Sequence, residues 1–400
     1  MYQKQIIVFF SAFITALLVF LGALYIYDPL SLFHTPYFGQ KRIHPNMRLQ
    51  IPGIANTYDF DSIIIGSSML ENTSADEASK LFGGSFANLS IAGSDFFERS
   101  LILEHLLEKK DLQAIIYSLD KYYLGQRRGS KSFPLQKYAY LYDNNRLNDL
   151  KVYLNTKNMR CLATFSTNKY CVGKTKTLNA PNAWFSEYSV HFGSIDNWFI
   201  GKTRKGIKRE FKDIIRLSES ERGTIATPQN QNGLKDNIKS AITYIDEYII
   251  RHVLENPDID FHLLFPPYSR IRYSKWYHLA PDKFQIHCAV LRYLTTRSST
   301  LHNLQVYAYG DFDFLDDLAN YKDESHFHES INSWLLYAMN EHIGILTEER
   351  VEEYIVSITN KARNFNLLAL GKIITCYLDN YDFGEAKRNE CLIGLDKNLW

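Results

Sequence analysis

The stretch Asp61-Ser-Ile-Ile-Ile-Gly66-Ser67-Ser68 carries the strongest signal for the fold. Three consecutive isoleucines predict a strand buried on both faces, as in parallel sheets, and the glycine and serines after it predict a tight turn. A serine at such a turn places its hydroxyl at the carboxyl edge of the sheet, near the free N–H groups of the following helix. On its own, this pattern is more often explained by helix capping.

Strand-like and helix-like segments alternate on both sides of this stretch. The expected strands are 61–66, 85–89, 114–119, 261–265 and 304–309. The expected helices are 73–82 (capped by Thr73 or Ser74), 95–110, 236–254, 281–297 and 329–339. This alternation predicts an α/β fold with a five-stranded parallel sheet, in which ligands bind at the carboxyl ends of the strands.

The N-terminus reads as a membrane-spanning helix. Ile6 to Ile26 form an uncharged apolar run, which at ~1.5 Å per residue spans the ~30 Å of a bilayer core. Lys4 precedes the run and Asp28 follows it, which favours a cytoplasmic N-terminus. No small-residue cleavage site follows, so we expect an uncleaved signal anchor over 1–27 with the rest outside the cytoplasm. The alternative is a buried core helix.

The remaining segments divide the chain. Residues 28–58 look irregular and predict a linker, and 59–345 hold the α/β domain. Within that domain, 125–235 are polar and basic in patches, which indicates a large insertion, with a helical cap as one option. Its part 222–233 is rich in Thr, Gln and Asn, as surface loops are. Residues 346–400 predict a C-terminal extension of one or two helices and a polar tail.

Composition narrows the function. The formal net charge is +1, so no global field favours nucleic acid. The 14% aromatic content suits a packed core as well as a sugar-binding surface. An odd number of cysteines stands at 161, 171, 288, 376 and 391. Cys161 and Cys171 are close enough to close a small loop in an oxidising compartment, but five free thiols remain an equal alternative. No CxxC pair points to zinc.

Two further motifs carry chemistry. In Asn88-Leu-Ser-Ile-Ala-Gly93, the glycine can point its N–H into a site at the sheet edge, or it is an ordinary turn glycine. In Asp323-Glu-Ser-His326-Phe-His328, His326 can act as a base with Asp323 orienting it. The alternatives are an Asp323 helix cap with His328 on the surface, or a zinc site made of Asp323, His326 and His328.

In their order, these motifs resemble the SGNH (GDSL-like) hydrolase superfamily. The chain looks closest to divergent, membrane-anchored members linked to acylation of cell-surface polysaccharides, such as those of alginate acetylation and teichoic acid D-alanylation. The resemblance covers 59–125 and 236–342. It implies a flavodoxin-like three-layer α/β/α fold, a triad of Ser68, Asp323 and His326, and an oxyanion hole from the N–H groups of Ser68 and Gly93, with no metal or cofactor.

The chain departs from this pattern in two places. Ser67 stands where the family has Asp, and Tyr117-Ser-Leu-Asp120-Lys-Tyr replaces the block Gly-x-Asn-Asp. The missing Asn removes an oxyanion donor, a loss of about 10²–10³ in rate, which favours slow and specific acyl transfer over general esterase activity. Asp120, and Tyr268 within Pro266-Pro-Tyr-Ser269, are candidates for binding substrate at the same edge, or plain turn residues.

The resemblance therefore implies an extracytoplasmic serine O-acyltransferase or esterase, acting through a Ser68 acyl-enzyme on an envelope polysaccharide or glycolipid. The resemblance implies a membrane protein as acyl donor, because acyl-CoA is absent outside the cytoplasm. The alternative is a non-catalytic glycan-binding or assembly component, which the missing Asn and the large insertion favour.

Overall fold

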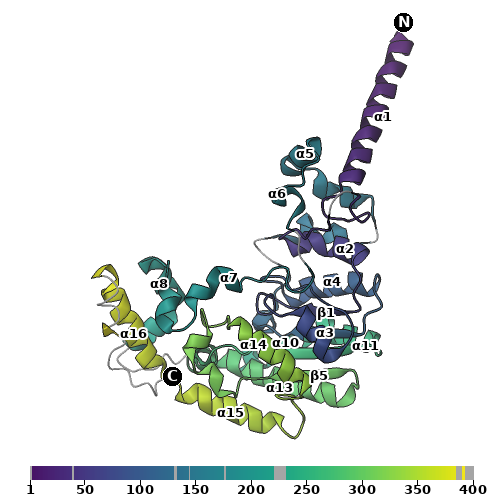
Figure 1. Cartoon of the computed structure of the whole chain (residues 1–400). Coiled ribbons are helices and arrows are strands. Elements are labelled where there is room, and N and C mark those ends of the chain that lie inside the picture. Colours follow the sequence, from purple (N-terminus) through teal and green to yellow (C-terminus); the bar gives the residue numbers. More distant parts are fainter. Residues whose placement is uncertain are drawn as a thin grey trace.

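Five parallel strands lie at the centre of the structure, a computed structural model that describes residues 2–37, 40–129, 133–143, 145–174, 177–219, 231–383 and 390–391 (Figure 1). The strands are β1 Ser62–Ile65, β2 Phe86–Asn88, β3 Ala114–Ser118, β4 Asp260–Phe265 and β5 Leu304–Ala308. They are ordered β2-β1-β3-β4-β5 and every pair is parallel. The predicted α/β class and five-stranded parallel sheet are confirmed.

The burial of β1 in the sheet explains why this strand could be predicted from the sequence. Ile63, Ile64 and Ile65 are all fully buried, as expected for a strand covered on both faces. Ile64 pairs with Asn88 of β2 and with Ile116 of β3, so β1 lies inside the sheet. Its carboxyl end therefore opens between two neighbouring strand ends.

Helices connect these strands, and one more follows the last strand. They are α3 Ala75–Phe82, α4 Phe96–Leu107, α10 Gln231–Ile245, α11 Arg251–Glu255, α12 Arg270–Leu279, α13 Pro281–Thr300 and α14 Glu329–Asn340. Ser74 caps α3, and Asp95 forms a capping box with Glu98 at the start of α4. A π-helical turn, Asp246–Ile250, joins α10 to α11. Helix α12 was not predicted, because its buried positions include polar Arg270 and Ser274, which break the apolar periodicity.

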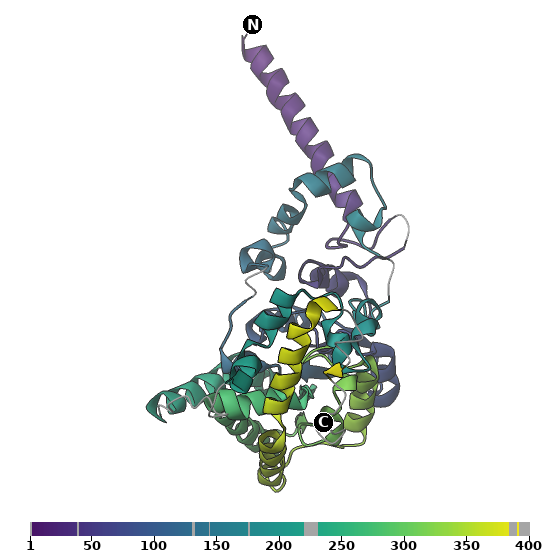
Figure 2. The same ribbon diagram turned by 90° about the vertical axis from the view of Figure 1, so that its left-hand side faces the viewer.

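Helix α1, Tyr2–Tyr27, is long and apolar enough to span a membrane by length and composition. It projects away from the rest of the chain in both views (Figures 1 and 2). Only its last turns are held by the domain, where Leu24 is buried. The predicted alternative, a buried core helix, is therefore wrong.

The linker predicted over 28–58 is wrong in part. Residues 47–57 form α2, Met47–Thr57, whose face of Met47, Ile51 and Ile54 is buried in the core. Arg48 at its start pairs with buried Glu98 of α4 at 2.8 Å. Pro52 inside the helix and the polar residues around its apolar face hid this element from sequence reasoning.

The segment 125–235, which the sequence predicts to be an insertion, lies between β3 and β4 and contains mostly short helices. Its elements are η2 Leu135–Lys137, η3 Ala139–Tyr142, η4 Asn148–Tyr153, α5 Thr156–Ala163, α6 Lys169–Val172, α7 Phe185–Tyr188, η5 Ser189–His191, η6 Ile195–Phe199, α8 Arg204–Glu210 and α9 Lys212–Glu219. A disulfide joins Cys161 to Cys171. Of the predicted surface loop 222–233, residues 222–230 lie outside the described residues and 231–233 begin α10.

The C-terminal extension has two helices, α15 Val351–Asn364 and α16 Leu367–Asp379. Helix α15 contacts α12 and α13, and α16 packs against α9 of the insertion. A second disulfide joins Cys376 to Cys391, while Cys288 is buried and free. Apart from 390–391, the predicted polar tail lies outside the described residues.

Candidate active site

Ser68 lies in the turn that follows β1, at the carboxyl edge of the sheet. Its Oγ is 2.9 Å from Nε2 of His326, a residue 258 positions later in the chain. Gly66 is needed at this turn, because a Cβ there would lie 2.7 Å from Oγ of Ser118 on the neighbouring strand. The glycine thus lets the Ser68 turn pass close to β3.

Asp323 orients the imidazole of His326. Its Oδ2 is 2.8 Å from His326 Nδ1, and its Oδ1 accepts the backbone N–H groups of Ser325 and His326, both at 2.9 Å. A carboxylate only accepts hydrogen bonds, so Nδ1 carries the proton and Nε2 is left to accept from the Ser68 hydroxyl. The structure thus joins Ser68, His326 and Asp323 in one hydrogen-bonded chain.

The surroundings of Asp323 keep its carboxyl group ionised. Burial raises the pKa of its carboxyl, but the hydrogen bond and charge of His326, together with Lys322, lower that pKa more, to well below its usual range. Lys322 Nζ lies 3.1 Å from Asp323 Oδ2. The carboxylate therefore stays ionised and can stabilise an imidazolium on His326.

Gly93 lies in a turn fastened to the strand end before Ser68. The carbonyl of Gly66 accepts the N–H of Ile91 at 2.9 Å and the hydroxyl of Ser94 at 3.0 Å. Gly93 has a φ of +68°, a conformation that favours glycine. Among the described residues, neither the N–H of Ser68 nor that of Gly93 donates to another protein group. Both remain free to donate to a developing oxyanion.

Asp120 lies at the predicted edge, but beneath the site. It is only 2% exposed, and its carboxylate accepts from Ser67 Oγ and Ser118 Oγ, both at 2.7 Å, and from the guanidinium of Arg99. Arg99 is itself fully buried and also donates to the backbone carbonyls of Ser94 and Ser118. This network makes Asp120 a support for the turns around Ser68, with its carboxylate turned to buried partners rather than to a substrate.

Tyr268 is likewise a supporting residue. It is 5% exposed, its ring packs edge-on against Trp276, and its hydroxyl accepts the backbone N–H of Lys121 at 3.3 Å. Burial raises the pKa of the Tyr268 hydroxyl well above its usual value. Position at a strand end was read correctly for Asp120 and Tyr268, but sequence does not show that both side chains point inward.

Trp184 is the residue that sequence reasoning missed. Its indole N–H donates to the carbonyl of Ser68 at 2.8 Å, and its ring stands edge-on to the His326 ring, with centroids 5.4 Å apart. It precedes α7 of the insertion, where Phe192 stacks on it, and Lys322 Nζ lies 4.9 Å from its ring. Only the aromatic density of 184–199 marked this segment in the sequence.

His328 faces away from the triad. Its Nδ1 accepts the N–H of Ser330 and caps α14, and its ring packs edge-on against Phe185 at 4.5 Å. Because His326 points to Ser68 and His328 points to the insertion, Asp323 and the two histidines do not converge on one point. Within the described ranges, no three His, Cys, Asp or Glu side chains gather closely enough to hold a metal ion.

The chain matches no known family model, and no curated protein is significantly similar to it. The function is therefore inferred from the geometry of these residues. The structure brings together Ser68, His326 and Asp323 and fastens the turn of Gly93 beside the Ser68 turn. It buries Asp120 and Tyr268, and it adds Trp184.

Proposed function

We propose that the protein is an extracytoplasmic serine O-acyltransferase or esterase that acts on an envelope polysaccharide or glycolipid. The observation that carries this proposal is the chain of hydrogen bonds from Ser68 through His326 to Asp323. Nucleophile, base and orienting carboxylate lie at hydrogen-bonding distance in the order that acyl transfer requires.

The reaction would proceed in two halves. Ser68 Oγ attacks the ester carbonyl carbon of the donor while His326 Nε2 takes the hydroxyl proton, and the N–H groups of Ser68 and Gly93 bind the oxyanion. The donor alkoxide then leaves with the proton from His326, which leaves an acyl group on Ser68. A sugar hydroxyl, or water, loses its proton to His326 and attacks this acyl group, which releases the new ester, or the free acid, and restores Ser68.

The strand order supports an SGNH-type, flavodoxin-like arrangement of three layers. The order β2-β1-β3-β4-β5 is that of flavodoxin-like sheets, which bind ligands at the carboxyl ends of β1 and β3, where the strand order reverses. Ser68 follows β1, and the network of Ser118 and Asp120 follows β3. The proposed site thus lies where this architecture places its ligands.

The aromatic surface beside the triad supports a glycan as acceptor. Trp184 contacts Ser68 and His326 directly, and Tyr188, 42% exposed, packs edge-on against it. Exposed aromatic rings offer apolar faces on which the C–H faces of sugars pack. Lys322 lies between these two rings and the triad, 4.9 Å from each ring, and can donate to sugar hydroxyls.

Two features support a location outside the cytoplasm. The disulfides Cys161–Cys171 and Cys376–Cys391 are typical of oxidising compartments. Helix α1 has the length and composition of a membrane anchor, with Lys4 in its first turn and Asp28 after it. A domain anchored in this way would take its acyl group from a membrane protein, since acyl-CoA stays in the cytoplasm.

The second candidate function is that of a non-catalytic glycan-binding component. It is favoured by the absence of the Asn of the Gly-x-Asn-Asp block. The two candidate functions differ in whether Ser68 is an activated nucleophile. We would treat the full chain in detergent with a fluorophosphonate probe, beside S68A and H326A. The surface variants S299A and H302A serve as matched controls.

Labelling that requires Ser68 and His326, but neither control position, is the result expected for the enzyme. Equal labelling of all variants, or no labelling of a chain that melts cooperatively, would overturn the catalytic proposal and leave glycan binding. Product analysis of the labelled enzyme's reaction with an acylated donor, with and without oligosaccharide, would then separate transfer from hydrolysis.

A further inference from the structure

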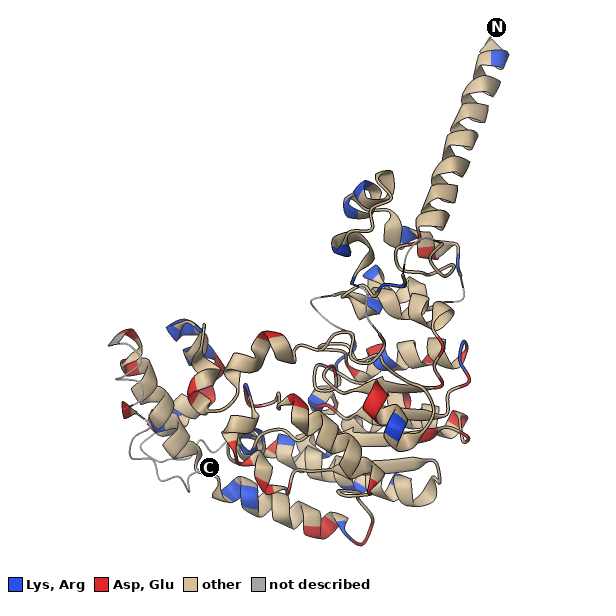
Figure 3. Ribbon diagram, in the orientation of Figure 1, with Lys and Arg blue, Asp and Glu red and all other residues tan. Residues whose placement is uncertain are grey.

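Positive charge is concentrated in one part of this nearly neutral chain. Residues 151–186 contain six Lys or Arg and no Asp or Glu, although the formal net charge of the whole protein is only +1. Figure 3 shows these cations on α5 and α6 and around them. Such segregation points to an anionic partner for this region rather than to general solubility.

This basic region lies beside the end of α1, at the level of its last turns (Figures 1 and 2). We call residues 154–174, which contain α5 and α6, the collar. The Tyr27 hydroxyl donates to the carbonyl of Ser166 at 2.6 Å, and the rings of Tyr27 and Phe165 are 5.7 Å apart. The disulfide Cys161–Cys171 closes the collar on itself. Where α1 leaves a membrane, the collar therefore lies at the membrane surface.

The collar exposes apolar and aromatic side chains between its cations. Leu154, Phe165 and Tyr170 are 57%, 48% and 69% exposed, and Lys157, Arg160 and Lys169 are exposed around them. Aromatic rings and leucines mixed with Lys and Arg, without acidic residues, are the composition of surfaces that lie in a membrane interface. In water the same side chains would remain unburied.

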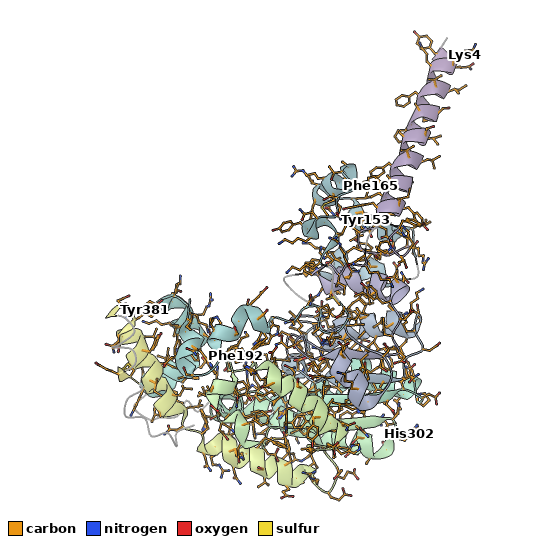
Figure 4. The ribbon with its side chains drawn as sticks, in the orientation of Figure 1. Lys4, Tyr153, Phe165, Phe192, His302 and Tyr381 are labelled. Atoms are coloured by element: carbon orange, nitrogen blue, oxygen red, sulfur yellow. A yellow bond between two sulfur atoms is a disulfide. The ribbon has the colours of Figure 1, made fainter. Side chains whose placement is uncertain are left out.

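The direction of the collar relative to α1 is fixed. The Asp28 carboxylate, directly after α1, accepts the N–H groups of Leu32 at 2.9 Å and Phe33 at 2.8 Å, together with the hydroxyl of buried Tyr153 at 2.5 Å. Tyr153 immediately precedes the collar, and Figure 4 shows it beside the end of α1 together with Phe165. A helix held in this way presents the collar to the bilayer at one orientation.

A cavity of about 290 Å³ opens where the end of α1, the segment 28–42 and the collar meet, and Asp28 is among its lining residues. Apolar groups of Ile26, Tyr27, Phe165 and Val172 line much of it, and Arg42 lies at its wall, where it donates to the carbonyl of Thr167. A concave apolar site with a cation beside it, at the depth where lipid chains begin, has the chemistry to take part of an acyl chain below its phosphate.

We propose that the collar binds anionic phospholipid in the leaflet from which α1 emerges. Lys157, Arg160 and Lys169 contact the headgroup phosphates, and one acyl chain enters the cavity beside Phe165 and Val172. The inference rests on the membrane topology proposed above and is independent of the chemistry at Ser68. An acidic protein as partner would meet the charges but leaves the exposed Leu and aromatic rings unexplained.

The test uses the full chain in lipid nanodiscs of phosphatidylcholine alone or mixed with phosphatidylglycerol. Hydrogen exchange is measured over 154–174 for the parent, for a collar variant K157Q/R160Q/K169Q, and for the control K205Q/K208Q/R209Q. The control removes the same charges from α8, which lies far from α1 in Figure 1. Each Lys or Arg near an anionic surface strengthens binding about fivefold, so the collar variant should dock on the order of 100-fold more weakly.

We expect slower exchange of the collar in anionic discs, lost in the collar variant and kept in the control. Equal exchange in both lipids, or equal behaviour of the two variants, would overturn the proposal and point to a protein partner. Inorganic phosphate added to phosphatidylcholine discs should not slow the exchange. If it does, a free anion site replaces the lipid site. Fluorophosphonate labelling of Ser68 in the same samples reports separately on the proposed enzyme.

The cavity is tested with phosphatidylglycerol that carries a photoreactive diazirine on its acyl chain. Cross-links to the peptide that contains Phe165 and Val172 are expected, and V172W, which fills the cavity, should remove them. Cross-links confined to α1 would refute the placement of the acyl chain.

Discussion

Replacing Asp323 by Asn tests the proposed triad with little change of shape. In the parent, Oδ1 accepts two backbone N–H groups and Oδ2 faces His326 Nδ1 at 2.8 Å. The Asn oxygen can keep the two backbone bonds, which turns its NH₂ group toward Nδ1. Two donors cannot face each other, so the imidazole proton moves to Nε2, which then cannot accept the Ser68 proton across 2.9 Å.

The expected loss follows from this tautomer change. In serine triads the same substitution lowers turnover about 10⁴-fold, or roughly 5 kcal/mol in the barrier. The assay is the second-order rate of fluorophosphonate labelling at Ser68 by full-length D323N. D317N is the matched control, because Asp317 also accepts a backbone N–H, that of Ala319 at 2.9 Å, but lies outside the triad. Labelling of D323N within tenfold of the parent would refute an orienting role for Asp323.

The same variant has a pH signature. The pKa of Asp323 is lowered in the folded chain, so its contribution to stability is present above its unfolded pKa of about 3.9 and is lost as the pH falls. D323N should therefore lose less stability on acidification than the parent, as measured by chemical unfolding at several pH values. An identical acid-side slope in both proteins would contradict the ionised state of Asp323.

Three further outcomes are expected. The variant W184F keeps a ring against His326 but loses the N–H that is donated to the Ser68 carbonyl. It should lower the labelling rate about tenfold with an unchanged melting temperature. An unchanged labelling rate would make Trp184 a packing residue only. R99M leaves the buried Asp120 charge unpaired and should cost about 3–5 kcal/mol in urea unfolding. The double variant R99M/D120L should cost less than the sum of the single changes, and strict additivity would argue against the pair. Burial and the charge of Arg251 lower the pKa of His252 to about 4, so on acidification the imidazole is protonated in the unfolded chain before it is protonated in the folded chain. The free energy of unfolding should therefore fall by roughly 3 kcal/mol between about pH 6.5 and pH 4. H252Q should remove this slope.

The sheet could be predicted from the sequence because its strands are buried on both faces. Continuous apolar runs such as Ile63–Ile65, with Gly and Ser behind them, mark a strand and its end without reference to distant residues. The start of α3, for which Ser74 was one of the two predicted caps, could be predicted for the same local reason. Helix α2 could not, since its buried face is interrupted by Pro52 and by Gln50, whose side chain hydrogen-bonds to the backbone of Leu30 and of His44.

The triad residues of the proposed site could be predicted from sequence motifs, but the side chains that surround them could not. Ser68 follows β1 directly, and Asp323 and His326 lie in the segment between β5 and α14, so the sequence order predicts that all three lie at one edge of the sheet. The Asp120 side chain points inward because it contacts Arg99 of α4, and no local sequence pattern predicts that contact. Trp184 enters from an insertion without periodicity, so its contact with Ser68 is a purely tertiary fact. The pairing of Cys161 with Cys171 remained open in the sequence and is resolved in the structure.

The separation of 258 positions between Ser68 and His326 has a consequence for biogenesis. Strand β1 and its serine leave the ribosome early, but their partner arrives only after β5 has been made. Contacts this distant in sequence form late and slowly, because a long loop must close before they stabilise anything. A chain that stops before His326 would hold the nucleophile without its base. The proposed reactivity at Ser68 would therefore appear only in chains translated past His326, and it would report on the completeness of folding.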